Sequence, residues 1–274
     1  MKHIATNNFS SDKIEKYSDQ FISNSPFPHM IIDNFLTIDS SNKILNNFNF
    51  NRHWNNYSLI NNRKHWGLTD QKKMDENCNE LFDELGSEEF VNLLSKITGI
   101  KGVFLDKTLD ASGLFQVFNG GRCSMHTDFN SHTIEKKWRR VLNILIYFNK
   151  DWLDEYNGQL EFWDENLKHK VKSISPIFNR CLIFRTDKKS YHGYPEKINI
   201  PSKMSRKSLA AWYFVEEDKE LELYPTKYRP RPNDSFFYGF LIHIDTFLNK
   251  IFAFLKRYHI LNDKIASKVL GLFK

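Results

Sequence analysis

Cysteine is scarce in this sequence. The three cysteines, Cys78, Cys123 and Cys181, lie far apart among 274 residues, and no two of them form a CxxC pair. A thiolate zinc site and a redox disulfide are therefore excluded, and we expect buried free thiols in a reducing compartment. The N-terminus also lacks an apolar segment of the signal-peptide type, which predicts a cytoplasmic protein.

Glycine and proline are few as well, with 11 and 8 residues respectively. Together with 41% hydrophobic and 15% aromatic residues, this composition excludes collagen-like, low-complexity and wholly disordered chains. The length fits one large domain or two small ones with a substantial apolar core. We therefore expect a folded, globular protein.

The excess positive charge is confined to the C-terminal part of the chain. The net charge is +6, and residues 226–274 contain nine Lys or Arg against three Asp, so the two signs balance in residues 1–225. Apolar residues recur there every three or four positions, while Asp245 and Lys250 fall on the other side. This spacing predicts an amphipathic helix, with the stripe Phe237, Leu241, Ile244, Leu248, Ile251, Leu255 and Tyr258.

Two kinds of element are expected in the first hundred residues. Prolines introduce a strand at 26–36, and Asp39 or Ser40 can cap a short helix that reaches Phe48, before a loop that extends to Asn62. Helical spacing of apolar residues then predicts two helices. They lie between Lys72 and Ile97, with an interruption near Gly86 and an end at Gly99. We expect this region to form a helical buttress for the rest of the domain.

After residue 100 the pattern changes to short runs rich in Val, Ile, Phe and Tyr. No segment between them is long enough for a crossover helix, which favours an antiparallel sandwich or barrel over a parallel sheet. We therefore expect a domain at 1–225 with a β core at about 100–216, and a helical extension at 226–274. The expected strands are 113–119, 122–127, 139–149, 158–163, 169–175, 180–185, 189–192 and 206–216.

His126 and Asp128 form an H-x-D pair at the end of a predicted strand, where both side chains share a face. His192 follows about six strands later, and a jelly roll makes its strand a neighbour of the first one. Two imidazoles and one carboxylate form the facial triad that holds ferrous iron and leaves three positions open. The alternatives are a hydrogen-bonded surface pair and a core histidine.

Arg206 begins the last predicted strand, which is apolar enough to be buried on at least one face. A buried guanidinium needs an anionic partner because an unpaired buried charge is costly. A ligand carboxylate bound in bidentate fashion is the partner that we expect. Pairing with Glu216 or Glu217 at the surface is the alternative.

Several motifs occur in the order of a known family, over residues 100–216. The chain resembles the iron(II)/2-oxoglutarate oxygenases of prolyl 4-hydroxylase type. The residues that carry this resemblance are His126-x-Asp128, His192 and Arg206, with Tyr147-Phe148-Asn149-Lys150-Asp151-Trp152, Gly158-Gln159-Leu160-Glu161, Pro176-x-Phe178-Asn179-Arg180 and Trp212-Tyr213-Phe214.

The resemblance implies a double-stranded β-helix and a cofactor set. Iron(II) would be held by His126, Asp128 and His192, and the distal carboxylate of 2-oxoglutarate by Arg206, with O2 as oxidant and ascorbate as an accessory reductant. Halogenating relatives lack the carboxylate ligand, so Asp128 favours hydroxylation.

The second contact to the cosubstrate is open at this point. The family's usual Gly-Gly-Gly-Leu-His-Gln stretch appears here as Ala111-Ser112-Gly113-Leu114-Phe115-Gln116, without its first glycines. Gln116 is kept and is expected to face the site. A tyrosine that helps bind 2-oxoglutarate in animal oxygen-sensing prolyl hydroxylases falls at Ile146 here. Tyr147, Asn143 and Gln116 are the candidates that remain. Outside this set, Arg180 is expected to be structural and His132 to be exposed, with a share in substrate recognition as its alternative.

These expectations lead to an Fe(II)- and 2-oxoglutarate-dependent hydroxylase of a C–H bond, with succinate and CO2 as co-products. A prolyl residue of a protein or a small molecule is the first substrate class, and no nucleic acid is expected as a partner. A membrane-associated hydroxylase of a lipid or lipid-linked sugar is one alternative, and an inert cupin-like binding module is another. The extension at 235–274 would dock on the core or contact an anionic membrane at its inner face.

Overall fold

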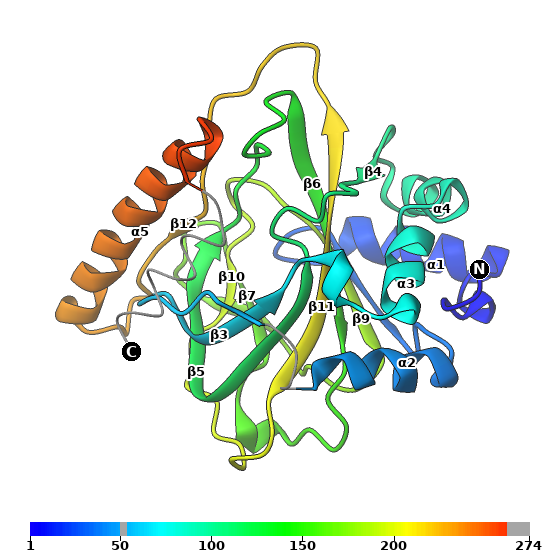
Figure 1. Ribbon diagram of the computed structural model, residues 1–274, viewed down its shortest axis with the longest axis horizontal. Helices are drawn as coiled ribbons and strands as arrows, with labels where there is room; N and C mark the ends of the chain where they lie inside the picture. Colours follow the sequence, from blue (N-terminus) through cyan, green and yellow to red (C-terminus); the bar gives the residue numbers. More distant parts are fainter. Residues whose placement is uncertain (50–53, 262–274) are drawn as a thin grey trace.

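The computed structural model of the chain describes residues 1–49 and 54–261 (Figure 1). Five helices occur in this part of the chain: α1 Ser11–Ser23, α2 Ile38–Leu45, α3 Glu76–Leu85, α4 Glu88–Thr98 and α5 Phe236–Arg257. The strands are β1 His29–Asp33, β2 Asn55–Asn56, β3 Asn62–Leu68, β4 Phe104–Leu105, β5 Gly113–Thr127, β6 Trp138–Tyr147, β7 Leu160–Trp163, β8 Lys170–Ile174, β9 Arg180–Arg185, β10 His192–Tyr194, β11 Arg206–Glu216 and β12 Lys227–Tyr228.

The strands form one antiparallel sheet that curls on itself. Its order is β1-β9-β6-β11-β5-β10-β7-β8, with β3 and β12 also paired to β5. Strand β5 belongs to both halves, because residues 113–117 pair with β11 and residues 123–126 pair with β10. The mainly β, jelly-roll fold expected from the sequence is confirmed.

The bend in β5 occurs at two glycines. A side chain at Gly121 would place its Cβ 2.8 Å from the carbonyl oxygen of Arg63 and 2.3 Å from the Val117 side chain. Gly120 has a positive φ of 79°, a backbone conformation that other residues adopt at a cost. The bend therefore requires glycine, and it carries the second half of β5 toward β10.

The N-terminal helices share one hydrophobic core with the outer face of the sheet. Phe82 of α3 and Leu94 of α4 are buried in the same cluster as Ile144 of β6 and Leu209 of β11. Tyr213 of β11 also donates a hydrogen bond to the carbonyl of Leu85, at 2.7 Å. The expected helical buttress is confirmed, and Figure 1 shows α1 to α4 together on one side of the sheet.

Several element boundaries differ from the sequence expectations. Helix α2 is capped by Thr37, whose Oγ1 accepts a hydrogen bond from the Ser40 N–H, so the expected cap at Asp39 or Ser40 was wrong. The strand expected at 189–192 begins only at His192. Residues 187–190 form a turn instead, in which the Asp187 N–H donates to Ser190 Oγ. Helix α1 and strand β3 were not anticipated.

The C-terminal helix exists as expected, but it faces the other way. Asp245 was assigned to the solvent side, yet its carboxylate is buried and accepts a hydrogen bond from the Asn61 N–H at 3.1 Å. Tyr238 contacts Ser124 of β5 through a 2.8 Å hydrogen bond between hydroxyls. Helix α5 thus packs on the β core, on the side away from α1 to α4 (Figure 1). Among the described helices, none has the length and apolar character needed to span a bilayer.

The shared core predicts that the buttress and the sheet unfold together. Phe82→Ala removes a fully buried ring and should lower the free energy of unfolding by about 3–5 kcal/mol. Circular dichroism and tryptophan fluorescence should shift to the same lower urea midpoint. Ile22→Ala, at a side chain that is 67% exposed, should change neither. Two separate transitions in Phe82→Ala, with the fluorescence midpoint unchanged, would contradict the shared core.

Candidate active site

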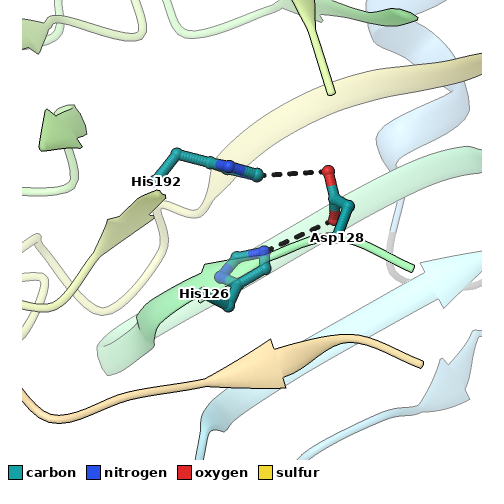
Figure 2. Close-up of side chains that lie close together, drawn as sticks. All are labelled: His126, Asp128 and His192. Atoms are coloured by element: carbon teal, nitrogen blue, oxygen red, sulfur yellow. Dashed lines mark ion pairs between the residues drawn. The ribbon is translucent and has the colours of Figure 1, made fainter. Parts of the chain in front are cut away.

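The three expected metal ligands meet at the end of β5 (Figure 2). His126 lies near the end of β5, Asp128 follows that strand directly, and His192 opens β10 opposite His126 in the ladder. Asp128 Oδ1 is 3.6 Å from His126 Nε2, and Asp128 Oδ2 is 3.4 Å from His192 Nε2. One candidate ligand atom of each residue lies within 4.8 Å of the others.

The two imidazoles are oriented by their own strands. Nδ1–H of His126 donates to the Ser124 carbonyl at 2.9 Å, and Nδ1–H of His192 donates to the Ser190 carbonyl at 2.9 Å. In the neutral form of each ring this hydrogen bonding assigns the tautomer, so that Nε2 carries the lone pair and faces Asp128. Two imidazole lone pairs and one carboxylate on one side of a small space fit a divalent metal ion of the ferrous type.

Asp128 is held in place by two side chains of β6. Its Oδ2 accepts hydrogen bonds from Arg140 at 3.1 Å and from Asn143 at 2.6 Å, and Arg140 Nε also donates to Asn143 Oδ1 at 2.7 Å. Burial alone would raise the pKa of Asp128. The charge of Arg140 and the proximity of His192 and His126 outweigh burial and hold this pKa well below its ordinary value. The carboxylate is therefore ionised and available as a ligand.

Arg140 is a residue of the candidate site that was not expected from the sequence. Its side chain is 1% exposed, and its guanidinium lies 3.8 Å from the centre of the Trp212 ring and 4.4 Å from that of Phe129. The neighbouring Arg139 points to the surface and pairs with Glu217. The strand alternation near Asp128 could have indicated that one of these two arginines faces inward.

A cavity of about 260 Å³ extends from the triad into the curled sheet. Its walls come from β3, β5, β6, β7, β9, β10, β11 and β12, and Arg206 also lines it. Arg206 is 4% exposed, donates from Nε to the Gly158 carbonyl at 2.7 Å, and packs against the Tyr194 ring. No described carboxylate pairs with it. A buried guanidinium without a protein anion fits a site for a ligand carboxylate.

The three candidates for the second cosubstrate contact lie in different places. Tyr147 Oη is 3.5 Å from an Arg206 nitrogen, whereas Ile146 is buried on the opposite side, in the core shared with the helices. Asn143 lines the cavity but is bonded to Asp128. Gln116 accepts a hydrogen bond from Ser205 at 2.7 Å and does not line the cavity. Tyr147 does not line the cavity either, but it contacts Arg206, whereas Gln116 has no contact with that residue.

Two further cavity residues come from outside the expected β core. His65 of β3 lines the cavity, and its buried Nδ1 has no hydrogen-bond partner among the described residues. Burial, with smaller effects of Arg206 and His126, lowers the pKa of His65 to about 4, so its imidazole is neutral at neutral pH. Tyr228 of β12 places its ring 5.0 Å from that of His126. Only their aromatic or imidazole character could have signalled them in the sequence.

His132 and Arg180, which the sequence placed outside the expected site, have contacts that stabilise the fold. His132 was expected to be exposed, which was wrong: it is 2% exposed, and its Nδ1 accepts the backbone N–H groups of Ile134 and Glu135. The loop folds inward because this imidazole satisfies a turn and faces the buried Asp106, whose Oδ2 lies 3.4 Å from its Nε2. Arg180 pairs with Asp33 of β1 at 2.6 Å, consistent with a structural role.

Comparison with known proteins agrees with this geometry. Residues 113–214 match the model of the 2OG-Fe(II) oxygenase superfamily. Mouse prolyl 3-hydroxylase OGFOD1 is 27% identical over 197 residues, which cover 69% of this chain and 33% of that protein. Human prolyl hydroxylase EGLN3 is 30% identical over 81 residues, or 29% of this chain and 31% of that protein. These similarities support a 2OG-Fe(II) oxygenase of the prolyl hydroxylase type.

Solved structures show the same fold. A Trichoplax adhaerens prolyl hydroxylase in complex with a hypoxia inducible factor peptide has a TM-score of 0.52 at 20% identity, covering 77% of this chain and 96% of that one. A Pseudomonas putida prolyl-4-hydroxylase gives 0.53 at 14% identity, covering 73% and 99%. HygX from Streptomyces hygroscopicus, with nickel, 2-oxoglutarate and hygromycin B bound, gives 0.50 at 7% identity, covering 78% and 90%.

The matched superfamily is named for iron(II) and 2-oxoglutarate. The residues present fit both groups, because the histidine lone pairs face an ionised carboxylate and the buried Arg206 lacks a protein anion. The chain aligns with about a third of the length of the curated relatives that it matches. Its substrate and its overall activity are therefore addressed as proposals.

The contact between Asn143 and Asp128 predicts an effect on metal affinity. Asn143→Ala removes one of the two β6 donors to the carboxylate, and loss of such a supporting hydrogen bond typically weakens metal binding by about 10- to 100-fold. Anaerobic calorimetric titration with Fe(II) or Mn(II) would measure this change. Asn149→Ala is the matched control, because this buried amide bonds only backbone groups, of Pro176 and Lys207, and none of the triad residues. Equal affinities of the two variants would contradict the assigned role.

Proposed function

We propose that this protein hydroxylates an unactivated C–H bond and converts 2-oxoglutarate and O2 into succinate and CO2. The observation that carries the proposal is one cavity with the complete triad at one end and a buried, anion-free Arg206 lining it. A pure binding module of cupin type has no need of all four residues together. We therefore favour an enzyme over the inert alternative.

The chain's own residues have separate tasks in this reaction. His126, Asp128 and His192 would hold iron(II), which supplies O2 activation when it is bound. Arg206 would bind the distal carboxylate of 2-oxoglutarate through two parallel hydrogen bonds, with the Tyr147 hydroxyl beside it. The apolar walls, which include Phe184 of β9, would exclude water from the reacting groups.

We also propose that His65 makes a second polar contact with the cosubstrate. The proposal follows from position, since His65 lines the same cavity as Arg206 and the expected metal ligand His126, and both of these residues lower its pKa. Its Nδ1 is buried without a partner, and leaving such a group unpaired is unfavourable. A ligand that extends from Arg206 to the triad would supply the missing hydrogen bond.

The substrate that we propose first is a prolyl residue of a protein. Support comes from similarity, because OGFOD1, EGLN3 and the two prolyl hydroxylase structures all bear that name. A small molecule is retained as a substrate class since HygX has the same fold and was solved with hygromycin B. A lipid or lipid-linked sugar is the second candidate, and the exposed apolar face of α5 is the observation that favours it.

Arg206→Ala tests the cosubstrate assignment. The variant should bind 2-oxoglutarate at least about 30-fold more weakly, because truncating one side of a buried charge pair costs about 2 kcal/mol or more. The charge-transfer absorption band of the anaerobic Fe(II) protein, titrated with 2-oxoglutarate, would report binding without turnover. Arg180→Ala, which removes an arginine paired with Asp33, should leave this affinity unchanged. Absence of any band in the folded wild-type protein would reject the oxygenase proposal itself.

The same titration tests His65. His65→Phe keeps a ring packed against Phe115, at 5.3 Å between centres, but removes both ring nitrogens. We expect 2-oxoglutarate binding to weaken by about 2- to 10-fold, as for one neutral hydrogen bond of about 0.5–1.5 kcal/mol. The control is His29→Phe, because His29 also has a buried unpartnered nitrogen but lies outside the cavity. Wild-type affinity in His65→Phe would remove this residue from the cosubstrate site.

A further inference from the structure

Helix α5 docks on the β core with its less apolar side. The buried residues of the helix are Gly239, Ile242, Asp245 and Thr246. Gly239 lies beside Pro230, and Asp245 accepts the Asn61 N–H. The contact is specific, because a carboxylate and a backbone N–H pair in a buried environment. The orientation of the helix on the core is therefore fixed by small and polar groups.

The opposite side of α5 is a continuous apolar surface, which we call the outer α5 face. Its side chains recur every three or four residues and are 37–94% exposed, although they are mostly aromatic. A water-exposed stripe of this size is unusual for a monomer and indicates an interaction site. The face consists of Phe236, Phe237, Phe240, Ile244, Phe247, Leu248, Ile251, Phe254 and Tyr258.

The charges of α5 determine which kind of partner fits this face. Asp245 is the single acidic residue of the helix, and it is buried against Asn61. Of the three cations in its second half, Lys250 is exposed, whereas Lys256 pairs with Asp110 and Arg257 donates to the Leu221 carbonyl at 2.9 Å. No negative charge of the helix therefore accompanies the outer α5 face. Residues 226–274 as a whole contain nine basic and three acidic residues, so this part of the sequence also has a net positive charge.

We propose that the outer α5 face binds the surface of an anionic lipid bilayer, with the helix lying in the plane of the interface. Aromatic and aliphatic side chains enter the boundary between headgroups and acyl chains, while the exposed Lys250 attracts anionic headgroups. A second copy of the chain fits less well, because the face offers no carboxylate to pair with the cations of its partner. The helix does not meet the requirements for a membrane span.

Vesicle flotation of the full-length protein tests this proposal without any need for turnover. The probes are vesicles of phosphatidylcholine alone and vesicles of phosphatidylcholine with phosphatidylserine. Wild type should float with the anionic vesicles, and added salt should reduce this binding, because exposed charges are screened. The double variant Phe240→Ser/Phe247→Ser should lose at least about tenfold in the bound-to-free ratio, and Lys250→Glu should lose part of it.

Matched controls separate lipid binding from general stickiness and from misfolding. Ile22→Ser/Ile38→Ser changes two side chains that are 67% and 66% exposed on α1 and α2, on the other side of the molecule, and should float like wild type. Wild type that stays unbound with anionic vesicles overturns the proposal. So does equal flotation of a Phe240→Ser/Phe247→Ser variant whose circular dichroism is native. A wild-type dimer that this variant converts to a monomer, without vesicle binding, would identify a second copy as the occupant instead.

Discussion

The antiparallel pairing of β10 with β5 is the constraint on which the site depends. Strand β10 is only three residues long, and it places His192 directly opposite His126. The two strands approach closely at Gly193, where a Cβ would lie 2.8 Å from the Ser124 carbonyl oxygen. That same carbonyl accepts the Nδ1–H of His126, so strand spacing and imidazole orientation are coupled. A larger residue at position 193 would separate the strands and turn the expected metal ligand His126 at the same time.

Sequence reasoning located the triad because its members are tied to backbone periodicity. His126 and Asp128 share a face two residues apart, and a jelly roll must bring the strand of His192 next to theirs. Arg140 was not found because the choice between it and Arg139 depends on register. Pairing of β6 with β11 shifts between Tyr213 and Phe214, and this irregularity cannot be read from local composition. Which of the two arginines faces inward therefore depends on the pairing of β6 with β11, a contact between segments far apart in the sequence.

The other omissions have related causes. His65 lies in β3, a strand of mostly polar residues that forms because it pairs along β5, and no alternation of apolar residues indicates such a strand. The periodicity of α5 was enough to predict a helix but not its orientation. Amphipathic patterns normally place the apolar side inward. Here Asp245 accepts a hydrogen bond from the Asn61 backbone N–H, and Tyr238 forms a hydrogen bond with Ser124. Gly239, on the same side of the helix, lies beside Pro230. Helix α5 therefore binds the core with its polar side, and its apolar side is exposed.

The C-terminal extension also contributes to the candidate active site, although its net positive charge distinguishes it from the rest of the sequence. Strand β12 pairs with the end of β5, so that Tyr228 lies opposite His126 and packs its ring against that ligand. The Tyr228 hydroxyl accepts a hydrogen bond from Asn62 of β3 at 2.7 Å, which joins the two segments that come from outside the β core. Loss of the extension would uncover His126 and remove a wall of the cavity. The boundary near residue 225 thus marks a change in surface chemistry, whereas packing continues across it, from the triad through Tyr228 to the helix that carries the outer α5 face.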